Sequence, residues 1–292
     1  MRWDTKKLIN FKKNNEGVAG IVVAVMLIGL LFAFLSVVQL NYVPDWSEER
    51  EAEHIETVAN QFTQMKFSVD ILSNIAVSGN KITTPLTLGT QEIPLPFLKS
   101  DKSFGFLRVF TDECMINITD KNPISYSNTV GSVKYSSRNS NYVNVDFIYE
   151  AGGIITNQDS GNTMYVMPYF DVESSSTVDI TYDIINLIED TGNKYTTGHG
   201  NIPLKLEYIQ TTSSTINNVD TITFFSSYLT AWYNFVNDTL SDAGLAYGPI
   251  GDYNLIQGSD EITIDFNDAL TVDMTLRIID INIQIGPGWL DI

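Results

Sequence analysis

The 292-residue chain contains one cysteine and two histidines, so it has few of the side chains on which most catalytic and metal sites depend. Cys114 has no second cysteine with which to form an intrachain disulfide. His54 and His199 are far apart in the sequence, and neither has another metal ligand at helical spacing. No glycine-rich loop follows a strand pattern and opens a helix, which is the signature of nucleotide binding. We therefore expect no enzyme activity, no cofactor and no metal site, and we expect His54 to be solvated.

Positive charge is also scarce. The chain has 17 lysine and arginine residues against 35 aspartate and glutamate residues, which gives a formal net charge of −18. Beyond Leu206 the only basic residue is Arg277. Because an acidic surface repels phosphates, nucleic acid is not an expected partner. Without a disulfide, stability has to come from the hydrophobic core, which a chain of this length can supply.

Residues 18–38 form an apolar run with no charged residue. At about 1.5 Å per residue, a helix of this length spans about 31 Å, close to the hydrocarbon thickness of a bilayer, about 30 Å. Basic residues precede the run and carboxylates follow it, so the positive-inside rule predicts residues 1–17 in the cytoplasm and residues 40–292 outside. The run is longer than the core of a secretory signal, about 7–15 residues. A removed signal peptide and a plain single-pass anchor are the alternatives.

The junction in front of this run carries more information. Residues 12–17 read KKNNEG, and the apolar stretch VAGIVV follows. This junction resembles the prepilin leader of archaeal type IV pilins and pilin-like proteins, with Glu16 where lysine or arginine is commoner in that family. The resemblance implies cleavage by a prepilin peptidase between Gly17 and Val18, where glycine permits an extended backbone. The helix would then stay on the mature protein and pack with other pilin subunits in a filament.

Three small residues in the run suit such packing. Gly20, Ala24 and Gly29 are four or five residues apart, and the first two have the small-xxx-small spacing that allows helices to approach closely.

A second, amphipathic helix is expected over residues 44–79. Pro44 lacks a backbone donor, so we expect it to break the first helix (residues 18–43) with a kink. Ser47 can then cap the second helix, and Gly79 can end it. The apolar stripe of this helix has heptad spacing and consists of Ile55, Val58, Phe62, Met65, Val69, Leu72 and Ala76. Packing on its own domain is favoured over an independent coiled coil. Residues 51–62 also resemble the stalk of archaeal pilin-like proteins.

Residues 80–292 have the composition and the period-two alternation of a β domain, as in residues 178–184 and 261–266. Many short strands punctuated by turn signals predict a two-sheet, sandwich-like head. In the last long strand the apolar residues change from even to odd positions. A β-bulge or corner is therefore expected near Ile278 and Ile279.

One helix is expected within the β domain. Apolar and aromatic residues between Phe225 and Leu240 follow the 3.6-residue period, and Gly244 lies where a C-terminal cap belongs. A helix packed on a sheet explains this stripe more simply than a ligand groove. Residues 149–155 and 164–168 predict two strands with a polar turn. Residues 157–162 weakly resemble a calcium loop but lack the 12-residue ligand pattern, so a turn is favoured.

Two glycosylation sequons, at Asn117 and Asn237, lie on the side predicted to be outside. They are possible modification sites, although sequons also arise by chance in a chain rich in asparagine and threonine.

These features together predict an α+β, mainly β protein: a leader (1–17), a membrane or filament-core helix (18–43), a stalk helix (44–79) and a β-rich head (80–292). The expected function is that of a major or minor structural subunit of an archaeal type IV pilus-like surface filament, with adhesion as a further role. The expected location is the cell membrane with an extracellular head, or the surface filament after processing. The alternative is an uncleaved single-pass anchor that carries an extracellular binding domain.

Overall fold

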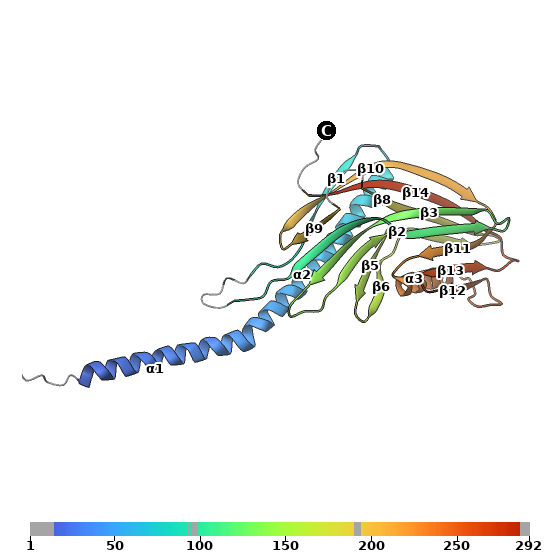
Figure 1. Ribbon diagram of the computed structural model, residues 1–292. Coiled ribbons are helices and arrows are strands. Elements are labelled where there is room, and N and C mark those ends of the chain that lie inside the picture. The colour runs from blue at the N-terminus through green and yellow to red at the C-terminus, as the bar shows by residue number, and fades with distance from the viewer. Residues whose placement is uncertain (1–14, 93, 95–98, 190–193, 287–292) are drawn as a thin grey trace, which may run out of the picture.

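The computed structural model describes residues 15–92, 94, 99–189 and 194–286, and its fold is α+β and mainly β, as predicted (Figure 1). A long helical segment leads into the head through α1 (Asn15–Val37), a π-helical turn (Val38–Tyr42) and α2 (Val43–Ile75). Figure 1 shows that α1 projects away from the strands, whereas α2 runs beside them. The head also contains the expected inserted helix, α3 (Leu229–Asp242).

The strands form two sheets, which confirms the prediction of a two-sheet head. The five-stranded sheet has the order β1-β10-β14-β8-β7, and the nine-stranded sheet has the order β12-β13-β11-β2-β3-β4-β5-β6, with β9 paired to β2. Strands β14 and β8 are parallel. The strands are β1 (Lys81–Thr87), β2 (Phe104–Asp120), β3 (Ser125–Arg138), β4 (Asp146–Glu150), β5 (Gly153–Gln158), β6 (Gly161–Val166), β7 (Phe170–Ser174), β8 (Val178–Ile188), β9 (Tyr195–Gly198), β10 (Asn201–Ile216), β11 (Val219–Phe225), β12 (Tyr253–Gln257), β13 (Glu261–Phe266) and β14 (Val272–Ile285).

Two clusters of buried side chains, each with members from both sheets, form the core. The first cluster includes α3, whose Trp232 stacks on Phe224 of β11 with ring centroids 4.8 Å apart. The aromatic stripe of α3 is therefore core, as the simpler interpretation predicts. The second cluster surrounds α2, where the fully buried ring of Phe62 lies 5.7 Å from that of Phe147 in β4.

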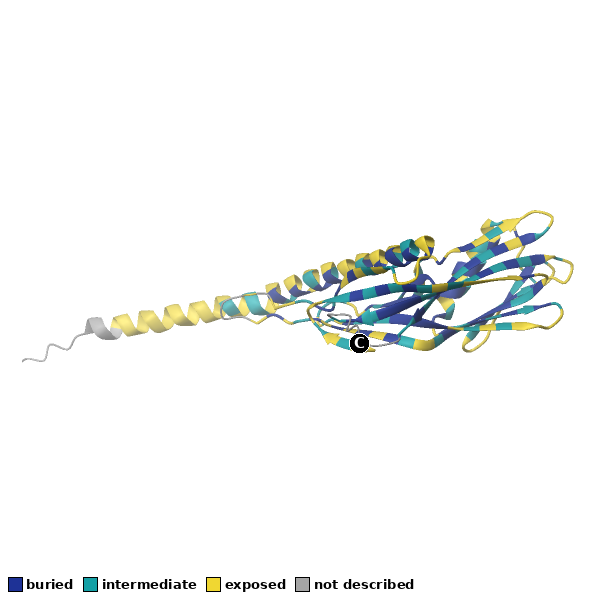
Figure 2. Cartoon of the chain, turned by 90° about the horizontal axis from the view of Figure 1, so that it is seen from above, coloured by how far each residue is buried: buried dark blue, intermediate teal, exposed yellow. Residues whose placement is uncertain are grey.

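Helix α2 is thus part of the core of the head and not a free stalk. Its residues Val58, Phe62, Met65, Val69 and Leu72 are all buried. The dark and light bands along α2 in Figure 2 show this division between a buried and an exposed face, in contrast to the coloured part of α1, which is almost entirely exposed. This packing confirms that the heptad stripe serves the chain's own domain and not an independent coiled coil.

The boundaries of the stalk helix differ from the prediction. Pro44 does not break the helix, because it lies in the first turn of α2, where a missing N–H is tolerated, directly after the π-helical turn. The helical axis changes direction where α1 meets α2 (Figure 1). Ser47 is not a cap, since it is buried within α2. The helix ends at Ile75, followed by Ala76 in a left-handed conformation, and does not extend to Gly79.

The phase change in β14 is accompanied by an irregularity in the neighbouring strand. Met274 and Leu276 belong to the first core cluster, whereas Ile279 and Ile281 belong to the second. The pairing of β14 with β8 continues without a shift, but the pairing with β10 shifts between Tyr208 and Gln210, opposite residues 280–281. The extra residue therefore lies in β10 and not in β14, two residues from the predicted position.

The predicted polar turn joins β5 to β6, and residues 149–155 form the end of β4, a turn and the start of β5 instead of one strand. Strands β4 and β5 form a tight hairpin. Its two-residue turn consists of Ala151 and Gly152, both with positive φ (49° and 91°), as a twisted two-residue hairpin requires. Residues 159–160 form the next turn, between β5 and β6, so the stretch that weakly resembles a calcium loop is part of a hairpin.

Candidate functional site

The most unusual surface of the molecule is that of α1. Its apolar side chains are exposed in every direction, and Met26 and Leu30 are 70% and 71% exposed. Among the described residues, this is the one helical segment long and apolar enough to cross a membrane, and none of its most apolar stretch is buried. Such a surface is stable only in lipid or against other apolar helices.

The structure leaves the small residues of this helix open. A Cβ added at Gly20 or Gly29 would meet no other atom within 4 Å, and Ala24 is exposed. No other described part of the chain covers the face on which these residues lie. The proposed junction between Gly17 and Val18 lies in the first turn of α1, which begins at Asn15. Only this end of the helix would have to unwind to present an extended backbone to a protease.

The transition from α1 to the head is marked by two aromatic residues. Tyr42 and Trp46 lie one turn apart with ring centroids separated by 6.1 Å, and both are exposed. Val43 and Ser47, which directly follow these two residues in the sequence, are buried. One turn earlier, the amide of Gln39 bonds both to the carbonyl (2.9 Å) and to the N–H (3.3 Å) of Lys99. The head therefore meets the helical segment at the end of its apolar run.

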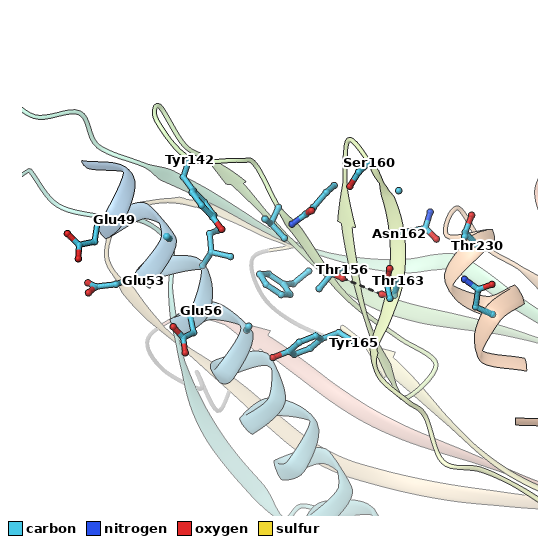
Figure 3. Close-up of a pocket in the computed structure, with 18 residues that line it drawn as sticks. Glu49, Glu53, Glu56, Tyr142, Thr156, Ser160, Asn162, Thr163, Tyr165 and Thr230 are labelled. Atoms are coloured by element: carbon cyan, nitrogen blue, oxygen red, sulfur yellow. Dashed lines mark hydrogen bonds between the residues drawn. The ribbon is translucent and has the colours of Figure 1, made fainter. Parts of the chain in front are cut away.

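A groove of about 890 Å³ lies between α2, the β5–β6 hairpin and the start of α3 (Figure 3). Apolar side chains of α2 and β4 contribute to its lining, together with hydroxyl and amide side chains of the hairpin. Figure 3 shows Glu49 and Glu53 on the side of α2 away from the hairpin. No lysine or arginine lines this groove, so it does not suit an anionic ligand.

Tyr165 has a special position in this groove. It is the extra residue at an irregularity in the β5–β6 pairing, where Ile154 pairs with Val166 and Ile155 with Met164. A bulge of this kind redirects a side chain. The Tyr165 ring is half exposed and packs edge-on against Phe147 at 6.4 Å. This groove could not be predicted, because its walls come from segments about 100 residues apart in the sequence.

The two histidines lie beside the same hollow, of about 420 Å³. The expectation that His54 is solvated is wrong: it is buried, and its Nε2 lies 3.0 Å from the hydroxyl of Tyr135. Since Tyr135 donates its hydroxyl proton to the carbonyl of Leu88 at 2.8 Å, Nε2–H of His54 is the donor to Tyr135. Burial lowers the pKa of His54. The described residues include both histidines and contain no group of three or more His, Cys, Asp or Glu side chains that could hold a metal ion.

Two carboxylates that read as ordinary in the sequence prove to be buried. Glu51 of α2 accepts hydrogen bonds from the backbone N–H groups of Ser140, Asn141 and Tyr142 at 2.7–2.9 Å. It thereby attaches the β3–β4 loop to α2.

Glu150, at the end of β4, is fully buried. It accepts hydrogen bonds from Ser226 Oγ at 2.6 Å and from Trp232 Nε1 at 2.7 Å. Burial raises the pKa of Glu150 to about 7, and these two hydrogen bonds oppose the increase. The neighbouring thiol of Cys114 is buried as well, which raises its pKa. These groups lie in the core, with no path by which a ligand reaches them, so they are structural.

The two sequons are half-buried. Asn117 lies in β2, which is paired on both sides, and its Oδ1 is inaccessible to solvent. Asn237 lies on α3, and its Oδ1 is 3.1 Å from the hydroxyl of Tyr253.

Comparisons of the chain with protein-family models, with curated proteins and with solved structures give no match.

Proposed function

We propose that this protein is a structural subunit of an archaeal type IV pilus-like surface filament, with α1 as the part that enters first the membrane and then the filament core. One observation carries the proposal: a single helical segment exposes its apolar side chains along most of α1 and buries one face in the head along α2. No described part of the chain covers this outer half, so it needs lipid or copies of itself.

The N-terminal junction favours a processed filament subunit over a permanent anchor. The resemblance of residues 12–18 to a prepilin leader implies cleavage before Val18, which would remove 5 basic and 2 acidic residues and change the net charge from −18 to −21. The released helix would be free of charge up to Pro44, as dense packing in a dry core requires. An acidic head facing water would keep the assembly soluble.

The rigid connection between helix and head supports a filament role. Because α2 is packed into both sheets, a force on α1 is transmitted to the core of the head and not to a flexible linker. The alternative function, an uncleaved membrane-anchored surface domain, uses the same exposed helix but requires no cleavage and no contact between subunits.

The test is the N-terminal residue of the protein isolated from its native membranes or surface fraction. The proposal expects Val18, detected by mass spectrometry of the intact chain. A mature chain that begins at Met1 or Arg2 would support the anchored domain instead. Replacement of Gly17 by phenylalanine should block cleavage and leave the protein in the membrane fraction, whereas Gly29→Phe should not affect cleavage.

A further inference from the structure

The exposed face of the turn that joins α1 to α2 has no explanation within the folded chain. Tyr42 and Trp46 are 53% and 41% exposed and stack loosely on each other, although aromatic rings of this size usually find cover. Leu40, two residues before Tyr42, is 74% exposed. These three residues continue the exposed surface of α1 beyond the end of the apolar run at residue 38.

We propose that this surface is a lipid contact: the outer headgroup layer of a bilayer lies at Tyr42 and Trp46 and sets the depth at which the chain sits in the membrane. The inference rests on the membrane insertion of α1 that the proposed function assumes. It goes further by naming the residues that meet the headgroups and by placing the head directly on the lipid surface.

The spacing along the helix fits a bilayer. A helix from Ala19 to Leu40 is about 33 Å long at about 1.5 Å per residue, enough to cross the hydrocarbon core of about 30 Å. Tyr42 and Trp46 then begin about 3 Å and about 9 Å above Leu40, and the headgroup layer is about 5–7 Å thick. Because side chains on a helix tilt toward its N-terminus, here the membrane side, both rings reach down into that layer.

The chemistry of the pair fits the same position. Tyrosine and tryptophan have an apolar ring and one polar group, and they are enriched at the boundary between lipid and water. The neighbouring charged residues would instead remain in water. Asp45 directly precedes Trp46, Glu48 follows it by two residues, and both are exposed.

The head is held at the same level. The two hydrogen bonds between Gln39 and the backbone of Lys99 tie the head to the helix at the edge of the apolar run. Val43 and Ser47, which lie about 100° around the helix from the aromatic pair, are buried. The change in axis between α1 and α2 lowers α2 toward the membrane plane when α1 stands upright (Figure 1). The aromatic pair therefore faces lipid while the adjacent face of the same turn faces protein.

The experiment measures the depth of Trp46 in lipid. The full chain, with Trp3→Phe and Trp289→Phe, is reconstituted into phosphatidylcholine vesicles that carry bromine either close to the headgroups or near the bilayer centre. The fully buried Trp232 stays as an internal reference, and the same chain with Trp46→Phe gives its emission alone. A matched control adds Tyr247→Trp to the Trp46→Phe chain, because Tyr247 is also about half exposed but lies beside α3, at the far end of the head.

The inference expects the emission of Trp46 to be lost to shallow bromine and much less to central bromine, with no loss for the tryptophan at position 247. Equal loss at both depths, or no loss at either, would overturn it. Flotation of the vesicles separates this failure from that of the proposed function. If the chain does not float with lipid, membrane insertion itself is wrong. If it floats and Trp46 is not quenched, only the headgroup contact is wrong.

Discussion

The carboxylate of Glu51 accepts a hydrogen bond of 2.7 Å from the backbone N–H of Tyr142, 91 residues further along the chain. With the N–H groups of Ser140 and Asn141, this contact fixes the β3–β4 loop on α2 at the entrance to the head. Helix α2 is therefore connected to the rest of the head by a buried carboxylate as well as by apolar packing.

Replacement of Glu51 by alanine should destabilise the head strongly, because three backbone donors would lose their shared acceptor. We expect a loss of about 2–4 kcal/mol in the free energy of unfolding, and a smaller loss for Glu51→Gln, which keeps one acceptor oxygen but no charge. Urea unfolding of the full chain in detergent, followed by tryptophan emission, measures the change. Glu48→Gln, at an exposed position of the same helix, should have almost no effect.

The burial of α2 leads to a second prediction. Phe62→Ala removes a fully buried ring from the second core cluster and should cost about 3–5 kcal/mol. Phe67→Ala, on the same helix but 65% exposed, should change stability by less than about 0.5 kcal/mol. Equal sensitivity of the two positions in the same unfolding assay would contradict the packing of α2 in the head.

The third prediction concerns pH. The pKa of Glu150 is raised to about 7 in the folded chain, above its ordinary value of 4.5, so the folded state holds this proton more tightly than the unfolded state. The resulting stability is fully present below about pH 4.5 and is lost as the pH rises through about 7, with a total change on the order of 3 kcal/mol.

Glu150→Gln tests this dependence, since an amide has the shape of the carboxyl group and does not titrate. We expect the variant to be more stable than the natural chain above pH 7, with little of the slope between pH 4.5 and 7. Thermal unfolding at a series of pH values compares the two chains. A variant whose slope in that range equals that of the natural chain would show that other groups cause it.

A fourth prediction addresses filament assembly. Val25 is 63% exposed in the middle of α1, so Val25→Asp places a charge where lipid or neighbouring helices must lie, at a cost of about 2.5–3.5 kcal/mol on insertion scales. Gly20→Leu would fill the open face that allows close approach. Both changes should abolish recovery of the protein in sheared surface filaments. Val25→Leu is the matched control and should assemble normally.

The result of that experiment separates the two proposed roles. If Gly20→Leu leaves the chain in the membrane but prevents its appearance in filaments, helix packing between subunits is required. If the natural chain never leaves the membrane fraction, the anchored surface domain is the better description.

Features that depend on neighbours in the sequence could be predicted. The charge-free run, the mainly β head and the period of α3 are all encoded within a few residues, because helix and strand periods repeat locally. The heptad stripe of α2 also identified its buried face correctly, from Val58 to Leu72. The filament role was inferred from local sequence at Gly17 and stays a prediction.

Contacts between distant segments could not be predicted. Nothing near His54 or Glu51 in the sequence shows that Tyr135 and the β3–β4 loop lie against them, and nothing near Pro44 shows that a π-helical turn lets the helix continue. The apolar pattern alone determined which residues must leave water. Only the tertiary structure decided which polar groups leave water with them, because a buried polar group is stable where a distant segment supplies its hydrogen-bond partner.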